Sequence, residues 1–417
     1  MKYVRTHETR DKFLADKDST SRGFRLAPTL YKYSDESEDE DNRDHIYLEL
    51  DDPRKHEGST YMEIALTSDV EFSFYIGNKS GDTQTTMTCT IDWGDDTIET
   101  KTITKEIIDD HYNEGFKLAH NYVAGSYKIE LYDVEREYSV VGDSANTRSL
   151  ISHPSSVKRV VLGERVVSIG DWTFYECKSL TSIFIPEGVI RINSYTFYGC
   201  SSLTSVYIPK DVASIGESAL RDCTSLTLVY IPEGVVSIKN RAFAWCRSLK
   251  SIHIPESVVS IEDYTFSSCL SLASVYIPDG VTIIRDGVFY NCSSLKSINT
   301  PEGVTSIGSQ AFYNCSSLKS INTPEGVTSI EPKTFWYCTS LKSIDIPEKV
   351  TSIGDSAFRG CSSLTSISSF NPTTPTLGGN IFLNLPTNGT LHIKPGATGY
   401  DAWLSKLPEG WRIVEDL

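Results

Sequence analysis

Nine of the ten cysteines recur at a constant interval, which makes them the first candidates for chemistry. Sulfur atoms that lie close together can form disulfide bonds or bind metal ions. Cys89 stands outside the series. The regularly spaced cysteines are 23 positions apart, at Cys177, Cys200, Cys223, Cys246, Cys269, Cys292, Cys315, Cys338 and Cys361.

The spacing argues against both kinds of chemistry. Metal sites use tightly spaced ligands such as C-x-x-C with a partner histidine, and this spacing does not occur in the sequence. Parallel segments about 4.8 Å apart allow a disulfide by distance alone, but their Cα–Cβ bonds point in one direction and not toward each other. An odd number of cysteines also cannot pair completely. We therefore predict buried free thiols that pack as small apolar side chains.

Three acidic residues and eight histidines are the other candidates. Asp92, Asp95 and Asp96 offer oxygen atoms, but calcium requires six or more, so we expect them to form hydrogen bonds within a turn. Whether they also bind calcium stays open. The histidines are scattered, and no nucleophile motif or phosphate-binding loop accompanies them. The sequence therefore predicts no catalytic residues, no metal site, no cofactor and no enzymatic activity.

The apolar residues follow the same 23-residue interval. Each cysteine of the series is followed by Leu three positions later and Ile or Val six positions later, usually by Ile eight positions later, and, except after Cys361, then by Pro. An earlier unit without a cysteine is found at residues 154–174. The residues from Asn291 to Ile307 occur again, unchanged, from Asn314 to Ile330. A period of this length with the pattern L-x-x-[IV]-x-I predicts a leucine-rich-type solenoid, in which each unit forms one turn.

One unit illustrates how the turns must be stabilised. Ile252 and Ile254 lie on the same face of a short strand because side chains alternate, and Pro255 ends the strand. About seven buried apolar side chains contribute on the order of 10–20 kcal/mol per unit. Ordering the backbone of one unit costs more than that, at about 1–2 kcal/mol per residue. A single unit therefore cannot fold alone, and the units must stack.

The repeat C-x-S-L-x-S-[IV]-x-I-P-x-x-V-x-x-I-x-x-x-[AT]-F resembles the BspA-like, Treponema pallidum type, leucine-rich repeats over slightly more than half of the chain. The resemblance implies surface-displayed proteins of bacteria and some protozoa, which attach to host or matrix proteins and have no catalytic site. Thr300 and Thr323 depart from the pattern because they replace the strand-ending Ile, so we expect a locally looser core.

Residues 59–140 differ from the repeats in their pattern of apolar and polar residues. Val70 to Ile76 and Tyr127 to Leu131 alternate in polarity and predict strands of a β-sandwich. CTIDWGDDT, followed by HNYVAGSYKIEL, resembles the polycystic-kidney-disease (PKD)-type immunoglobulin-like domain. Asp96 stands where that family usually has Gly, so we expect a more strained turn. The fold class predicted is mainly β: a solenoid of 23-residue units preceded by an immunoglobulin-like β-sandwich.

Two further segments complete the predicted domain organisation of 1–58, 59–140, 150–370 and 371–417. Residues 1–58 are polar, with an acidic run at 34–44 that predicts a solvated linker and a possible strand from His45 to Leu50. The first thirty residues resemble the N-terminal segments of virion proteins from gut bacteriophages. After the repeats we predict a cap that covers the apolar end of the last turn, formed by Leu391, Ile393, Trp403 and Trp411.

Composition limits the partners and the location. No apolar run of 18 or more residues exists, so no membrane span is predicted. The start of the sequence, MKYVRTHETRDKFLADKD, lacks the apolar segment of a secretory signal. A net charge of −16 disfavours nucleic acid, whose phosphates would be repelled.

Binding is the function that a solenoid favours, because its turns present rows of equivalent outward positions. The residue between the two apolar strand positions is aromatic or His in five successive units, and Lys lies beside it in several units. Exposed aromatic residues are candidate contact residues, although stacked rings also stabilise neighbouring strands. The predicted binding residues are Phe184, Tyr207, Tyr230, His253, Tyr276, Lys250, Lys296, Lys319 and Lys342.

Two functional hypotheses follow. The first is a non-catalytic recognition or adhesion protein, located at the cell surface or outside the cell, that binds a host or matrix protein or glycan through the solenoid. The alternative is a structural protein of a bacteriophage virion, docked to other virion proteins by its N-terminal segment. The missing signal peptide fits the alternative better than the first hypothesis. The sequence leaves the ligand, the organism and the oligomeric state open.

Overall fold

The computed structural model describes residues 59–78, 86–104, 106–107, 114–132, 134, 138–140 and 151–417. The chain divides into the units Met1–Gly58 and Ser59–Leu417, and only the second contains described residues. The N-terminal docking or linker segment, the acidic run at 34–44 and the possible strand at His45–Leu50 therefore lie outside the described residues.

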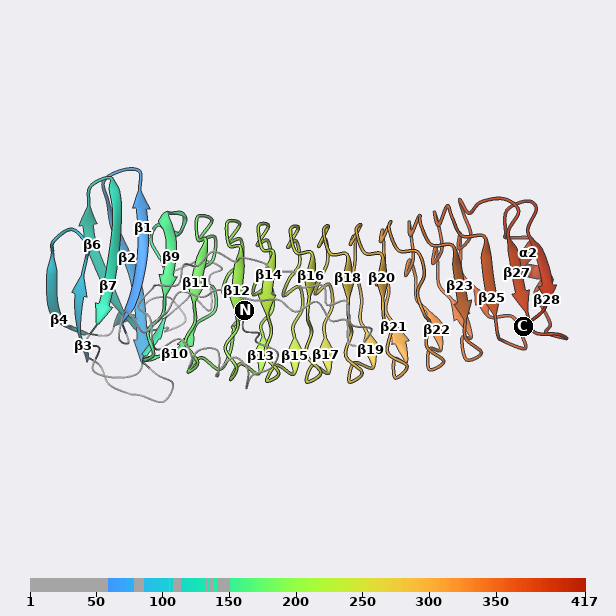
Figure 1. Cartoon of the computed structure of the whole chain (residues 1–417), viewed down its shortest axis with the longest axis horizontal. Helices are drawn as coiled ribbons and strands as arrows, with labels where there is room; N and C mark the ends of the chain where they lie inside the picture. Colours follow the sequence, from blue (N-terminus) through green and yellow to red (C-terminus); the bar gives the residue numbers. More distant parts are fainter. Residues whose placement is uncertain are drawn as a thin grey trace, which may run out of the picture. The chain divides into compact units, whose positions relative to one another are not determined.

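Eight strands of the described residues precede the repeats and belong to two sheets (Figure 1). Strands β1, β7, β3 and β4 lie in one sheet, and β8, β2, β6 and β5 lie in the other. The buried side chains between them include Phe72, Met87 and Trp93. The strands predicted at Val70–Ile76 and Tyr127–Leu131 are confirmed, whereas the PKD-type immunoglobulin-like assignment stays a prediction. The strand bounds are β1 Thr60–Leu66, β2 Val70–Asn78, β3 Thr86–Asp92, β4 Ile98–Thr104, β5 Glu106–Ile107, β6 Glu114–Tyr122, β7 Gly125–Tyr132 and β8 Tyr138–Val140.

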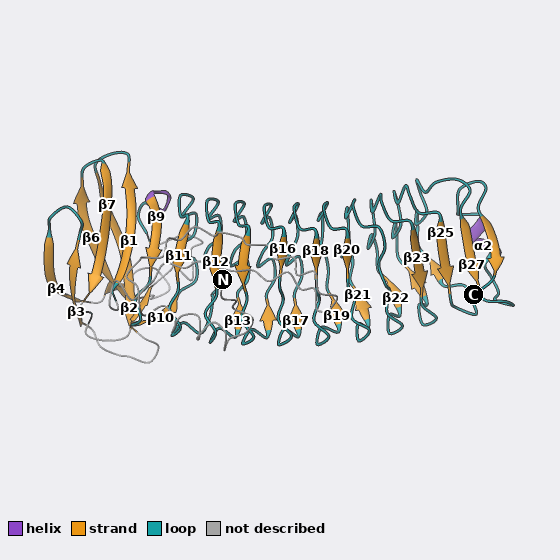
Figure 2. Ribbon diagram, viewed as in Figure 1, coloured by secondary structure: helices purple, strands orange, loops and turns teal. Residues whose placement is uncertain are grey.

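The remainder of the chain is a β-solenoid, as the repeat predicted (Figure 2). Most turns contribute two short strands, one to each of two faces. The first strand of each turn follows the conserved Leu position, and the first-face strands are β9 Val157–Val161, β11 Ser182–Phe184, β12 Ser205–Tyr207, β14 Leu228–Tyr230, β16 Ser251–Ile252, β18 Ser274–Val275, β20 Ser297–Ile298, β23 Ser343–Ile346 and β25 Ser366–Ser369. The second-face strands are β10 Val166–Ile169, β13 Ser214–Ile215, β15 Ser237–Ile238, β17 Ser260–Ile261, β19 Ile283–Ile284, β21 Ser306–Ile307, β22 Ser329–Ile330, β24 Ser352–Ile353 and β26 Thr376–Leu377.

Equivalent residues of successive turns pair with each other. Ser237 pairs with both Ser214 and Ser260, each 23 positions away, and the strands are parallel. Because the sequence repeats, most buried pairs join identical or similar apolar residues, such as Ile215 with Ile238 and Ile252 with Val275, so the buried positions of one turn complement those of the next. Stacking therefore replaces the core that a single turn lacks.

Columns of identical residues fill the interior of the solenoid. The phenylalanine that closes each unit is fully buried. From Phe243 to Phe358 the rings of successive turns are stacked, with centroids between 5.6 and 5.8 Å apart. Leu220 occupies this position in the turn between Phe197 and Phe243 and is also fully buried. The rings thus contribute van der Waals contact along the stacking direction as well as apolar burial.

Each end of the solenoid is covered by a different set of elements. At the N-terminal end, β9 pairs antiparallel with β1, and β10 pairs parallel with β8, so both sheets of the preceding strands continue into the first turn. At the C-terminal end, β27 (Thr390–Ile393) and β28 (Arg412–Glu415) extend the first face, with the short helix α2 (Asp401–Leu404) between them. The predicted cap residues are confirmed as buried, at Leu391, Ile393, Trp403 and Trp411.

Candidate functional site

The predicted binding residues form two adjacent columns on the first face of the solenoid. Phe184, Tyr207 and Tyr230 end the strands β11, β12 and β14, and His253 and Tyr276 come directly after β16 and β18. Because the residues on either side of each position point into the core, these five side chains point outward. The structure therefore brings the predicted aromatic residues together in one row.

The exposure of this row increases along the chain. Phe184, Tyr207 and Tyr230 are half-buried, whereas His253 and Tyr276 are exposed. The rings of Tyr207 and Tyr230 are stacked, with centroids 5.1 Å apart and planes at 5°. The Tyr207 hydroxyl also lies 3.5 Å from Oε1 of Glu187. The early rings thus stabilise neighbouring strands, and His253 and Tyr276 present the most surface to a ligand.

The lysine column is exposed along its whole length. Lys250, Lys296 and Lys342 come directly before the strands β16, β20 and β23, and Lys319 holds the equivalent position in the turn between β20 and β23. Backbone hydrogen bonds connect Lys296 to Lys319 and Lys319 to Lys342, so three ammonium groups project from consecutive turns. Beside them the aromatic row gives way to Asn299, Asn322 and Asp345. The face therefore changes from aromatic to polar and basic along the solenoid.

A second set of aromatic residues lies at the corner of the turns. Tyr290 and Tyr313 are stacked with centroids 4.6 Å apart, and the Arg359 guanidinium lies 4.9 Å from the Trp336 ring. Tyr198 stacks on Tyr175 at 5.0 Å. These contacts are packing between neighbouring turns.

The nine regularly spaced cysteines line the interior and are free thiols, as predicted, and Cys89 is also buried. Eight of them donate a hydrogen bond from Sγ to a backbone carbonyl 26 positions earlier in the chain; Cys292, for example, contacts the carbonyl of Phe266 at 3.1 Å. Burial raises the pKa of the Cys292 thiol to about 12 and that of Cys361 to about 12. The thiolate that nucleophilic or metal chemistry requires is therefore strongly disfavoured.

The aspartates near residue 95 form the hydrogen bonds expected of a turn. Oδ1 of Asp92 accepts from the backbone of Gly94 at 2.8 Å, and Oδ1 of Asp95 accepts from the backbone of Thr97 at 3.2 Å. Asp96 has a φ of 70°, in the left-handed region that favours glycine, so the turn is strained at this residue. Among the described residues, no group of three or more His, Cys, Asp or Glu side chains could hold a metal ion.

His120 belongs to the same corner. Its ring stacks on Trp93 with centroids 5.0 Å apart, and Nε2 lies 2.8 Å from Oδ2 of Asp95. Burial alone would raise the pKa of Asp95, but hydrogen bonds from His120 and Thr97 outweigh it and lower that pKa. This histidine therefore packs against Trp93 and is hydrogen-bonded within the turn.

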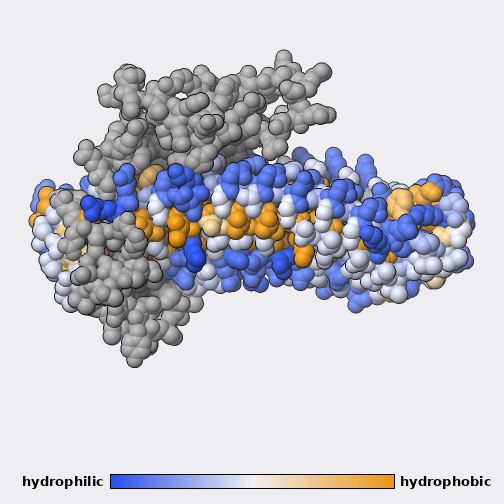
Figure 3. Space-filling view, turned by 90° about the horizontal axis from the view of Figure 1, so that it is seen from below, coloured by the Kyte–Doolittle hydropathy of each residue, from blue (hydrophilic) through white to orange (hydrophobic). Residues whose placement is uncertain are grey.

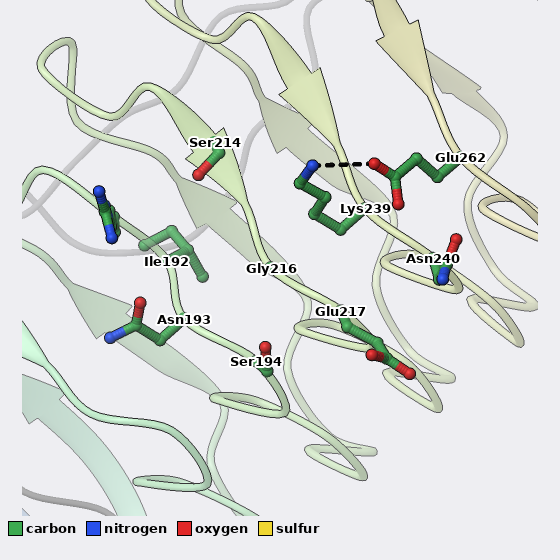
Figure 4. A pocket seen from close by; sticks show the side chains of 10 residues that line it. Ile192, Asn193, Ser194, Ser214, Gly216, Glu217, Lys239, Asn240 and Glu262 are labelled. Atoms are coloured by element: carbon green, nitrogen blue, oxygen red, sulfur yellow. Dashed lines mark hydrogen bonds and ion pairs between the residues drawn. The ribbon is translucent and has the colours of Figure 1, made fainter. Parts of the chain in front are cut away.

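A shallow pocket of about 340 Å³ opens on the second face (Figure 4). Nζ of Lys239 and Oε1 of Glu262 are 2.8 Å apart across it. Asn193 donates from Nδ2 to the backbone carbonyl of Ile169. Lys239, Glu262 and Asn193 are thus bonded within the protein, and none of the lining residues is a histidine or a cysteine. The lining residues are Arg191, Ile192, Asn193, Ser194, Ser214, Gly216, Glu217, Lys239, Asn240 and Glu262.

Sequence reasoning missed one surface feature, an exposed apolar row on the second face. Ile190, Val236 and Val259 occupy equivalent positions and are 57%, 47% and 58% exposed. Aligning the units by their cysteines places these residues in one column, so the signal was present in the sequence. It was hidden because each residue follows a buried valine and looked like part of the core.

The architecture defines a parallel β-solenoid of the leucine-rich type, with no helix in the described residues that is long and apolar enough to cross a membrane. The BspA-type leucine-rich repeat region, in six copies, matches residues 151–273 and 259–388. The chain therefore belongs to the BspA-type leucine-rich repeat family. This family and fold are those of non-enzymatic repeat proteins, which are associated with surfaces.

Several solved structures are similar to the chain. A leucine-rich cell surface protein from Faecalibacterium prausnitzii is 24% identical, with a TM-score of 0.38, over 66% of this chain and 94% of that chain. A leucine-rich repeat protein from Bacteroides ovatus is 24% identical, with a TM-score of 0.42, over 77% and 100%. The T. pallidum leucine-rich repeat protein is 31% identical, with a TM-score of 0.33, over 50% and 83%. No curated protein matches the chain.

Proposed function

We propose that the protein is a non-catalytic recognition or adhesion protein that binds a protein or glycan of a host cell or matrix through the first face of its solenoid. The observation that carries the proposal is the outward row of Phe184, Tyr207, Tyr230, His253 and Tyr276, which is followed along the same face by exposed lysines. Membership of a surface-associated repeat family supports it. The virion alternative stays a prediction.

The chemistry of the face indicates the kind of ligand. Exposed aromatic side chains supply large contact areas at low entropic cost, and they are enriched among residues that dominate binding energy. The lysines Lys296, Lys319 and Lys342 add positive charge in three consecutive turns. An extended, acidic protein or glycan is therefore the ligand class that the face fits.

The test measures binding of the full chain to an array of immobilised matrix proteins and acidic glycans. We expect His253→Ala with Tyr276→Ala to weaken binding to the bound component by about tenfold or more, as for residues that dominate an interface. The melting temperature should stay nearly unchanged, because both side chains are exposed. Thr328→Ser, on the second face, is the matched control and should bind as the wild type does.

Two results would count against the proposal. One is the absence of binding to every matrix protein and glycan on the array. The other is unchanged binding by the His253→Ala, Tyr276→Ala variant, which would place the contact elsewhere. Fractionation of producing cells addresses location separately, because a surface protein is recovered with the envelope and a virion protein is recovered in purified particles.

A further inference from the structure

The exposed apolar row on the second face occupies a defined stretch of the solenoid. Five consecutive turns place Val167, Ile190, Ala213, Val236 and Val259 at the same position, and we call these residues the apolar row; Val167 is half-buried and the other four are exposed. In the following turns the position is threonine, beginning at residue 282. Figure 3 shows an apolar band along the middle of this surface with hydrophilic residues on both sides. The row itself ends where threonine takes over the position, so it is not a general property of the repeat.

Glycines leave part of the row uncovered. A Cβ atom at Gly280 would lie 3.1 Å from Cγ1 of Val259, and one at Gly188 would lie 3.8 Å from Cγ1 of Val167. The equivalent position beside Ile190 and Val236 carries the short side chains of Asp211 and Ser257. Contiguous exposed apolar surface of this kind marks interaction sites in soluble proteins.

The charges beside the row are unequal. The residues two and three positions before each row residue form one edge of the row. At this edge, every turn of the row and the turn after it carries a carboxylate, whereas only Arg165 and Lys210 carry a positive charge. On the other edge, Arg191 and Lys239 lie around the same pocket as Glu217 and Glu262, so the charges balance. The carboxylates of the acidic edge are Glu164, Glu187, Asp211, Glu233, Glu256 and Asp279.

The distance between successive side chains of the row indicates whether a helix or a strand of a partner fits it better. Paired parallel strands are about 4.8 Å apart, so the five turns span about 19 Å. An α-helix returns an apolar side chain to one face every 5.4 Å and covers this length in about 13 residues. A strand presents the same face only every 6.6–6.8 Å or so. The helix is the better match.

We propose that the apolar row binds a cationic amphipathic helix of a partner protein. The apolar stripe of the helix lies on Ile190, Val236 and Val259, and its lysines or arginines lie opposite the acidic edge. This site is on the second face, so it goes beyond recognition through the aromatic row.

The test uses the full chain and a synthetic helical peptide with a leucine stripe bordered by lysines. Fluorescence anisotropy compares it with a peptide of the same composition in scrambled order and with one that carries glutamate in place of lysine. The helical peptide should bind at least about tenfold more tightly than either. Its affinity should fall as salt rises, because exposed charges are screened.

Val236→Thr with Val259→Thr is the decisive variant. Threonine occupies the same position at Thr282 and Thr305, so the change is compatible with the fold. We expect peptide affinity to fall by about tenfold with an unchanged melting temperature. Tyr276→Ala, on the first face, should leave peptide binding unaltered, which separates this site from the proposed function.

Three outcomes would overturn the inference. Equal affinity for the helical and scrambled peptides would indicate general charge attraction. Full affinity in the double threonine variant would show that the row is not the contact. Dimerisation that depends on Val236 and Val259, measured by sedimentation, would show that a second copy of the chain occupies the row.

Discussion

Thr300 and Thr323 are the residues at which the sequence departs most clearly from its own repeat. Both replace an isoleucine that is buried in other turns, such as Ile254 and Ile277. Both are themselves buried, and neither hydroxyl oxygen has a hydrogen-bond partner among the described residues. A buried polar group without a partner destabilises the folded state, so the core is weakest in these two turns. The sequence-based expectation of a looser core is consistent with this.

Replacing these threonines should stabilise the protein. Thr300→Val with Thr323→Val removes the unpaired hydroxyls at nearly constant volume, so we expect the free energy of unfolding to rise by about 1–3 kcal/mol per site. The urea midpoint measures the change. Thr305→Val, at an exposed position, is the control and should shift the free energy by less than about 0.5 kcal/mol. An unchanged midpoint in the double variant would contradict the explanation.

The turn is the element that the sequence describes least completely. Two positions per turn have a positive φ, for example Arg241 and Trp245 in one turn and Lys333 and Tyr337 in another. Only some turns place glycine there, such as Gly360 with a φ of 76°. A side chain in the left-handed region costs about 1–2 kcal/mol, so the stacked neighbours must hold these corners in place. Composition gives no sign of them, because residues of many types occupy the positions.

Alanine substitution at two glycines should show how much the left-handed backbone and its close contacts contribute to stability. At Gly360 a Cβ would lie 2.7 Å from Cδ1 of Tyr337 in a left-handed backbone, so Gly360→Ala should lower the free energy of unfolding by at least about 1–2 kcal/mol. At Gly303 the nearest atom would be 3.7 Å away, so Gly303→Ala should be neutral or stabilising by up to about 1 kcal/mol. Urea denaturation measures both, and equal effects would refute the conformational argument.

The whole solenoid is held together by contacts between neighbouring turns. Stability is then the sum of the turns and their interfaces, and the ends need separate protection. In this protein, β1 and β8 protect one end, while β27, β28 and the buried Trp403 protect the other. Among the described residues, the strands of an interior turn pair with those of the adjacent turns, so an interior turn should be dispensable.

Deleting residues 292–314 tests this at the scale of the molecule. The deletion removes one complete turn and joins Asn291 to Cys315, so that Phe289 stacks on Phe335 in place of Phe312. We expect the shortened protein to fold, to give a circular dichroism spectrum of the same shape as that of the full chain, and to melt cooperatively. Deletion of residues 292–303 removes about half a turn, shifts every later column out of register, and should abolish folding. Equal behaviour of the two deletions would argue against independent turns.

Much of the fold was predictable because each buried position recurs nine or ten times in the sequence. The pattern that predicts Ile252 and Ile254 inside also predicts His253 outside, and both are observed. The free thiols followed from the same regularity. The sequence predicted that the proposed binding residues form one row. It did not predict that Phe184, Tyr207 and Tyr230 are half-buried, because ring stacking depends on the distance between turns.

The sequence by itself determined the solenoid, its period, its core columns and the residues of its C-terminal cap. Local periodicity sets which side chains are buried, and repetition makes the signal strong. Only the tertiary structure decided that strands β1 and β8 continue both faces of the first turn, that two corners per turn are left-handed, and that the apolar row is exposed. These features arise from pairing between different segments and from the path of the backbone, which no single repeat encodes.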